Sequence, residues 1–153
     1  MFSIAQETPR QPEVLALFEQ SDAYAASLYP QEGHYPVDAD YLSVPHVRFF
    51  VARWQGVAVG CCALVIGSDR VGELKRMIVD PAARGRGIGR GLMAAIEEVA
   101  ITEGIRLIQL ETGPANGPAL ALYRTCGYQE RGPFGSYQPS PYSLFMERSL
   151  VRS

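Results

Sequence analysis

Apolar residues recur along this chain with two spacings, one typical of helices and the other typical of strands. The helical spacing predicts three helices, over residues 12–28, 88–103 and 116–126. Pro12 falls in the first turn of the first helix, where proline is tolerated. Gly104 and Gly127 follow the ends of the other two, as glycine commonly does where a helix closes.

Apolar runs and alternations predict seven strands, over residues 2–6, 47–52, 57–66, 73–79, 106–111, 128–132 and 142–147. Gln55-Gly56 signals a hairpin between the second and third strands. Residues 29–45, which hold three prolines, predict a loop with one short helix near 38–42. The order strand, helix, strand, helix across residues 73–127 requires one parallel pair, with antiparallel strands on either side. The predicted fold is therefore α/β, with a mixed sheet and helices on both faces.

Length and charge narrow the function classes. At 153 residues the chain fits one domain, over 1–153, with a substantial core. The formal net charge of −2 disfavours a general nucleic-acid-binding protein. No apolar run approaches the length of a membrane span, and no basic start precedes an apolar block as in a secretory signal. We therefore expect a cytoplasmic protein that binds neither nucleic acid nor membrane.

The cysteines and histidines argue against two further kinds of site. Cys61, Cys62 and Cys126 are odd in number and lack metal or redox spacing, which favours buried, reduced thiols. A nucleophilic cysteine is the alternative, with only His34 and His46 available as a partner. Because these two histidines lack the spacing of a metal-binding pair, we expect no metal site.

The most informative stretch is residues 72–91, where an apolar strand pattern stops at Asp80-Pro81 and a loop leads into a helix. The loop alternates arginine with glycine: Arg84, Gly85, Arg86, Gly87, Gly89, Arg90 and Gly91. The first turn of a helix has unpaired N–H groups and partial positive charge, and glycines let a phosphate approach that backbone. Arginines add bidentate donors for phosphate oxygens. The stretch predicts a phosphate cradle; a solvated basic loop is the alternative.

Two motifs together resemble the GNAT superfamily of acyl-CoA-dependent N-acetyltransferases. Arg84-Gly85-Arg86-Gly87-Ile88-Gly89 matches (Gln/Arg)-x-x-Gly-x-Gly, which that superfamily uses to hold the CoA pyrophosphate. Asn116-x-x-Ala119-x-x-Leu122-Tyr123-x-x-x-Gly127-Tyr128 is similar to its second CoA segment. The resemblance covers about residues 47–150, and it extends to a bacterial branch with Glu-x-Lys-Arg-Met at 73–77 and Gly-Pro-Phe-Gly at 132–135. It implies a GNAT-like fold whose one parallel pair splays apart.

The resemblance implies transfer of an acetyl group from acetyl-CoA to a primary amine of a small molecule or peptide, in a ternary complex. CoA has a pyrophosphate for the cradle, and its pantetheine arm can pair with an exposed strand as an added strand would. The residues implied to bind acetyl-CoA are Met77, Ile78, Val79, Arg84, Gly85, Arg86, Gly87, Ile88, Gly89, Arg90, Asn116, Ala119 and Tyr123. Relatives often pair through edge strands, so a homodimer is compatible with the resemblance but is not determined by it.

The family positions also imply an acid and a base. Tyr123 occupies the position of the proton donor to the CoA thiolate; a free thiol has a pKa near ~8.5 and a phenol near ~10. A core aromatic is the alternative for Tyr123. Glu73 lies where several members place the base that deprotonates the amine, and Glu111 is the second candidate. A surface ion pair with Lys75 or Arg76 is the alternative for Glu73.

The acceptor pocket has weaker candidates, which packing or edge protection explains equally well: Tyr29, Tyr35, Glu111, Phe134 and Tyr137. Two rival functions remain. Gly89-Arg90-Gly91-Leu92-Met93-Ala94 fits the G-x-G-x-x-A fingerprint of a dinucleotide-binding oxidoreductase, but it begins nine residues after the strand ends and lies on an apolar helical face. A non-catalytic acyl-CoA sensor that kept the cradle is the other.

Overall fold

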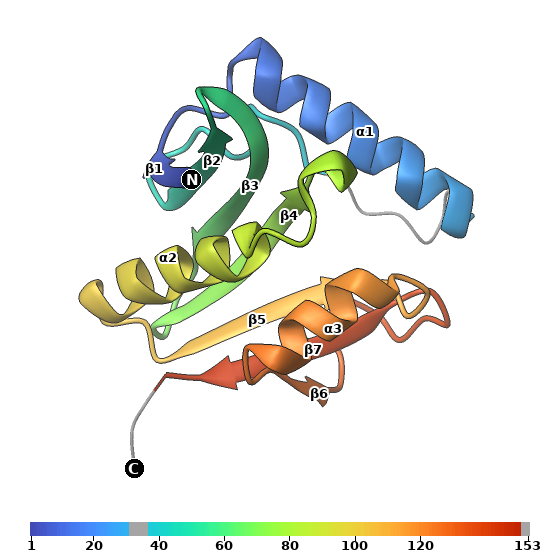
Figure 1. Ribbon diagram of the computed structural model, residues 1–153. Coiled ribbons are helices and arrows are strands. Elements are labelled where there is room, and N and C mark those ends of the chain that lie inside the picture. The colour runs from blue at the N-terminus through green and yellow to red at the C-terminus, as the bar shows by residue number, and fades with distance from the viewer. Residues whose placement is uncertain (31–36, 151–153) are drawn as a thin grey trace.

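A computed structural model describes residues 1–30 and 37–150 of the protein. It contains one sheet of seven strands in the order β1-β2-β3-β4-β5-β7-β6 (Figure 1). The strands are β1 (Phe2–Gln6), β2 (Val47–Trp54), β3 (Val57–Ile66), β4 (Val71–Val79), β5 (Leu107–Thr112), β6 (Gln129–Arg131) and β7 (Leu144–Ser149). The helices are α1 (Pro12–Leu28), α2 (Ile88–Thr102) and α3 (Gly117–Thr125), with a short 3-10 turn, η2 (Pro81–Ala83). The predicted mixed α/β architecture is confirmed.

The sheet is antiparallel at every neighbouring pair of the described strands except β4 and β5, which run parallel as predicted. Alternate side chains of β2 divide between two cores, because successive residues of a strand point to opposite faces. Phe49 and Val51 pack in the core beneath α1, whereas Phe50 and Ala52 pack in the core beneath α2 and α3. The helices therefore cover both faces of the sheet, as the sequence predicted.

The glycine and arginine loop leads directly into α2. Gly87 is the residue before its first turn and has a φ of +79°, a left-handed conformation that favours glycine. Ile88, Leu92 and Ile96 form the predicted apolar face and are fully buried. The helix closes at its other end beside Gly104, whose φ is +77°.

Strand β4 carries the irregularity that opens the sheet. Between its pairs with Cys61 and Ala63 of β3, β4 holds one extra residue, and Arg76 in this bulge has a φ of +54°. On the other side, β4 pairs with β5 only from Val71 to Leu74. The end of β4 beyond Leu74 therefore runs away from β5, and its edge is not covered by that strand.

Two local predictions differ from the structure. The short helix predicted near residues 38–42 is a turn, in which the Asp38 side chain accepts from the Tyr41 N–H at 2.8 Å and the Leu42 N–H reaches the Asp38 carbonyl at 3.3 Å. A single helical turn is costly to nucleate without further turns to extend it. Several strand ends also shift by one or two residues. None of the helices in the described part of the chain is long and apolar enough to cross a membrane.

Candidate active site

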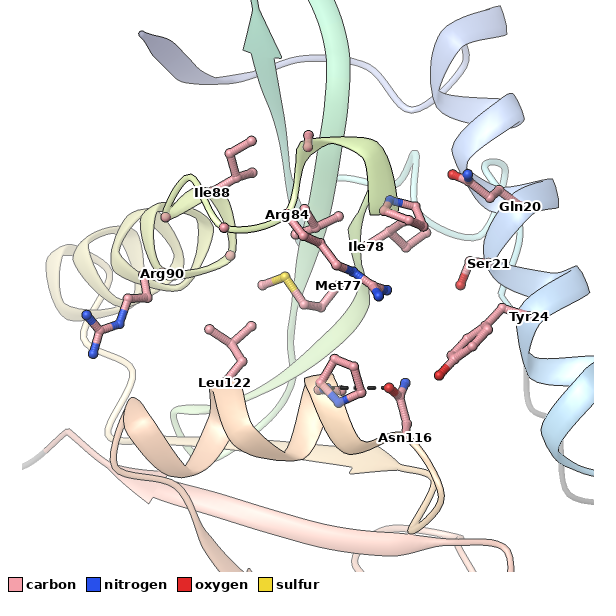
Figure 2. Close-up of a pocket in the computed structure, with 18 residues that line it drawn as sticks. Gln20, Ser21, Tyr24, Met77, Ile78, Arg84, Ile88, Arg90, Asn116 and Leu122 are labelled. Carbon is pink, nitrogen blue, oxygen red and sulfur yellow. Dashed lines mark hydrogen bonds between the residues drawn. The ribbon is translucent and has the colours of Figure 1, made fainter.

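A cavity of about 370 Å³ lies where β4 leaves β5, enclosed by α1, α3 and the start of α2 (Figure 2). Most of the residues that the sequence assigned to acetyl-CoA line it. The predicted lining residues are Met77, Ile78, Val79, Arg84, Gly85, Gly87, Ile88, Gly89, Arg90, Asn116 and Ala119. The structure thus brings together the two motifs, which are separated by some thirty residues in the chain.

The cradle has the open backbone that its glycines predicted. Gly85 and Gly87 have φ values of +85° and +79°, and no heavy atom lies within 4 Å of where a Cβ would stand on either. Arg84 extends into the cavity, and Arg90, which lines the cavity from the first turn of α2, projects from that helix (Figure 2). Arg86 behaves differently, because its guanidinium stacks over the Trp54 ring at 4.5 Å and is not among the lining residues.

The cavity continues along the splayed part of β4. Met77, Ile78 and Val79 border it at the point where β5 no longer covers their edge. Leu122 of α3 closes the opposite side, and a Cβ on Gly89 would approach its Cδ2 to 3.1 Å. This close approach explains why the second residue of α2 is a glycine. The result is a groove with apolar walls and a cationic, glycine-lined end.

A second cavity, of about 170 Å³, adjoins the first. The two share four lining residues, Ser21, Met77, Asn116 and Ala119. Most of the other residues that border the second cavity are polar or aromatic, among them Tyr29, Glu73, Lys75, Glu111, Thr112, Tyr123 and Tyr142. It thus holds both candidate bases and the candidate acid, next to the groove that holds the cradle.

The two carboxyl groups of the second cavity have different surroundings. The Lys75 ammonium lies 3.0 Å from Oε2 of Glu73, and the Tyr137 hydroxyl donates to the same oxygen at 2.7 Å. Burial raises the pKa of Glu111, and the positive charge of Lys75 opposes this shift. The carboxylate of Glu73 is thus held by two donors, whereas burial disfavours the charged form of Glu111.

Tyr123 lies between the core and the cavity. Its ring is 6 % exposed and stands 6.1 Å from the Tyr128 ring, so part of its role is packing, the alternative weighed from the sequence. It also lines the second cavity. Burial raises the pKa of Tyr123 well above its ordinary value, so its hydroxyl stays protonated and is a donor at any working pH.

Comparison with known proteins shows the family to which the chain belongs. The family model of the acetyltransferase (GNAT) family matches residues 14–128. An IAA acetyltransferase from Azospirillum brasilense is 46% identical over 149 residues, which are 97% of each chain. The chain belongs to the GNAT acetyltransferase family. It is an acetyl-CoA-dependent N-acetyltransferase.

Solved structures agree with the fold of this acetyltransferase. A proposed acyl-CoA N-acyltransferase from Klebsiella pneumoniae superposes with a TM-score of 0.87 at 37% identity, covering 99% of each chain. PaiA N-acetyltransferase from Thermoplasma acidophilum, solved in complex with coenzyme A, superposes with a TM-score of 0.76 at 17% identity. That match covers 97% of this chain and 99% of the other, and at such low identity it shows the shared fold alone.

Helix α1 supplies a wall of both cavities of the acetyltransferase, and the sequence analysis named none of its residues as a site candidate. Gln20, Ser21 and Tyr24 face the first cavity (Figure 2), while Ser21 and Ala25 border the second with Tyr29. The positions that face the cavities recur with helical spacing, and this spacing was the only indication in the sequence that they share one face of α1. The direction in which such a face points depends on where the helix packs, which the spacing does not give.

Two side chains fix α1 in place. Arg76, with a side chain only 9 % exposed, donates to Asp22 of α1 at 2.6 Å and to the Val37 carbonyl at 2.8 Å, and its guanidinium lies over the Phe18 ring. At the end of α1, the Tyr29 hydroxyl accepts from the Ala115 N–H at 2.8 Å. The helix is thus tied both to the bulge of β4 and to the loop before α3.

The remaining predicted residues have mixed outcomes. Phe134 and Tyr137 are not among the residues that line either cavity; they pack with Phe145 of β7. Tyr137 nevertheless reaches Glu73, as described above. Tyr35 lies outside the described residues. The Asn116 side chain caps α3 by accepting from the Ala119 N–H at 3.4 Å, and Asn116 also borders both cavities, so its two readings are compatible.

The alternative chemistries find no support in the acetyltransferase. Cys61 and Cys62 are fully buried, and this burial raises the pKa of Cys61 to about 12 and that of Cys62 well above its ordinary value, so neither is a ready thiolate. The dinucleotide frame that begins at Gly89 lies inside α2. Among the described residues, no three or more His, Cys, Asp or Glu side chains gather as metal ligands would.

Proposed function

We propose that this acetyltransferase binds acetyl-CoA in the first cavity and a primary amine in the second, and joins them in a ternary complex. One observation carries the proposal: the two cavities share lining residues, with the cradle in one and the acid and base candidates in the other. A thioester carbonyl placed at Met77 and Asn116, where the cavities meet, would be within reach of an amine in the second. The acceptor is a small molecule or a peptide.

The cofactor site follows from the groove. The pyrophosphate of CoA would lie on the N–H groups of the loop and the first turn of α2, where the helix dipole and Arg84 favour negative charge. The pantetheine arm would run along the edge of β4 that β5 leaves uncovered, from Met77 to Val79. Asn116 and Ala119 would border its reactive end. The CoA bound to the Thermoplasma structure supports this ligand.

The chemistry needs two proton transfers and no covalent enzyme intermediate. An ammonium group cannot attack, so one proton passes to Glu73 and the freed lone pair forms the C–N bond with the thioester carbonyl carbon. The C–S bond then breaks with its electron pair going to sulfur. Tyr123 gives its proton to that sulfur and takes the second proton that the nitrogen loses. The products are the acetylated amine, the CoA thiol and one proton released through Glu73.

The raised pKa of Tyr123 is consistent with this exchange. A buried phenol is a poor acid when it must be left charged. When its proton is replaced by one from the nitrogen, no tyrosinate accumulates. Tyr123 and Asn116 both line the second cavity, which supports Tyr123 as the donor to the leaving sulfur.

The test is acetyl-CoA turnover, followed by release of the CoA thiol, over a panel of primary amines and N-terminal peptides. IAA is tested separately from the amine panel, because the Azospirillum relative is named for it. Glu73→Gln should lower kcat within the about 10²–10⁴-fold range of a general base, most strongly at lower pH where the amine is protonated. Tyr123→Phe should lower kcat more than it changes acetyl-CoA affinity.

Matched controls are available for both substitutions. Glu98 lies on the exposed face of α2 and Tyr41 is 50% exposed, so Glu98→Gln and Tyr41→Phe should retain wild-type kcat. Wild-type kcat in Tyr123→Phe would leave that residue a core aromatic. If Glu73→Gln kept its rate at every pH, Glu111 or a water molecule would be the base.

A further inference from the structure

The second cavity is flanked by three polar groups that form a closed triangle. Lys75 Nζ donates to the Tyr137 hydroxyl at 2.7 Å, and that hydroxyl donates to Oε2 of Glu73, also at 2.7 Å. Lys75 Nζ lies 3.0 Å from the same Oε2. Both contacts of Glu73 therefore use one of its two carboxylate oxygens, and neither uses Oε1.

The triangle is sheltered from water. The Lys75 side chain is 14 % exposed and that of Glu73 is 23 % exposed. In such a site the contacts between charged groups are screened less than on an open surface, so they restrict the carboxylate more strongly. A glutamate side chain has several rotatable bonds, and a base that must meet an amine gains from losing this freedom before the substrate binds.

Tyr137 is itself firmly placed, although it lies in the connection between β6 and β7. Its ring centroid is 5.1 Å from that of Phe134 and 5.4 Å from that of Phe145, a buried residue of β7. Burial, together with its bond to Glu73, raises the pKa of Tyr137 well above its ordinary value. The hydroxyl therefore remains protonated and keeps donating to Glu73 at any working pH.

We propose that Tyr137 is a positioning residue for the acetyl transfer: with Lys75 it holds Glu73 by Oε2 and thereby presents Oε1 to the amine. This inference rests on the proposed function, in which Glu73 is the base. The proton leaves the ammonium nitrogen for Oε1, and the electron pair of that N–H bond stays on nitrogen for the attack. The segment that links β6 and β7 thus takes part in the reaction through a residue that does not line either cavity.

The experiment is a double-mutant cycle with Tyr137→Phe and Glu73→Gln, measured as kcat and KM for the amine, acetyl-CoA affinity and thermal stability. Tyr137→Phe removes the hydroxyl and retains the ring that packs on Phe134 and Phe145. We expect kcat to fall at least about ten-fold, inside the range that a general base contributes, with acetyl-CoA affinity unchanged. In the Glu73→Gln background the same substitution should have no further effect on kcat, because Tyr137 acts through Glu73.

Lys75→Gln is the second variant, and it should also lower kcat without weakening acetyl-CoA binding. Tyr41→Phe, which removes a half-exposed hydroxyl, is the control with wild-type kinetics. Wild-type kcat in Tyr137→Phe, or an equal loss with and without Glu73, would overturn the inference. If Glu73→Gln alone is fully active, the base of the proposed function fails as well; if Glu73→Gln is slow and Tyr137→Phe is not, only the positioning role fails.

Discussion

Gly87→Ala tests the loop as a ligand site, and Gly104→Ala is its matched control. The pair separates the effect of backbone strain from the loss of ligand binding. The two glycines have nearly identical φ values, +79° and +77°, and an added Cβ would meet no heavy atom within 4 Å at either. Each stands at one end of α2. Packing is therefore unchanged in both variants, and only the left-handed conformation resists alanine, at about 1–2 kcal/mol. In a protein of this size that lowers Tm by about 2–8 °C.

The two variants should differ only toward acetyl-CoA. Gly87 lines the cavity and Gly104 does not. A methyl group at Gly87 occupies the space through which a phosphate would approach the loop, so we expect at least a ten-fold loss of affinity, equal to about 1.4 kcal/mol. Gly104→Ala should bind as the wild type does. Isothermal titration calorimetry with acetyl-CoA measures the affinities, and thermal unfolding without ligand measures the strain.

The possible results are well separated. Equal, undiminished affinity in both variants would refute the assignment of the loop as a pyrophosphate cradle. Equal losses in both would trace the effect to a general loosening of α2. Gly87→Glu adds a negative charge and should abolish binding, while a thermal transition close to that of Gly87→Ala would show that its fold is intact.

Two further predictions concern the charged groups of the site. Arg84→Ala should weaken acetyl-CoA binding several-fold and make the binding less sensitive to salt. Arg86→Ala should instead lose mainly the stacking on Trp54, about 0.5–1 kcal/mol of stability. Titrations with acetyl-CoA at two salt concentrations check both variants, and equal losses of affinity in the two would contradict the prediction. Glu111→Gln should raise Tm at pH 8 but not at pH 3. Burial raises the folded-state pKa of Glu111, so the stability that Glu111 contributes is complete below the ordinary pKa of a glutamate and is lost as the pH rises through the folded-state pKa. A Tm difference independent of pH would exclude that account.

The sequence predicted the elements well because each was encoded locally. The helix over residues 12–28 and the strand over 57–66 match the structure at both ends, since their apolar patterns stop at clear turn signals. The segment near residues 38–42 failed for a local reason too. Asp38 caps the turn with its own side chain, and one turn of helix had no following turns to stabilise it.

The site was predictable where contact follows from a contiguous motif, and not where it depends on tertiary packing. The cradle glycines had to lie at the start of α2 because the strand, loop and helix are consecutive. The orientation of Arg86 toward Trp54 depends on β2, thirty residues earlier, and no spacing rule reports it. Likewise Tyr137 meets Glu73 across 64 positions of the chain, so the sequence identified both residues but not the bond between them.

The placement of α1 has a consequence for how this enzyme can change. Helix α1 borders both cavities, and the bonds of Arg76 and Tyr29 hold it against the bulge of β4 and the loop before α3. On the proposed function, a new side chain at Ala25, which borders the second cavity and not the first, would alter which amine is accepted without entering the acetyl-CoA cavity. The proposed function thus implies that one face of α1 can change the accepted amine while the glycine and arginine loop stays unaltered.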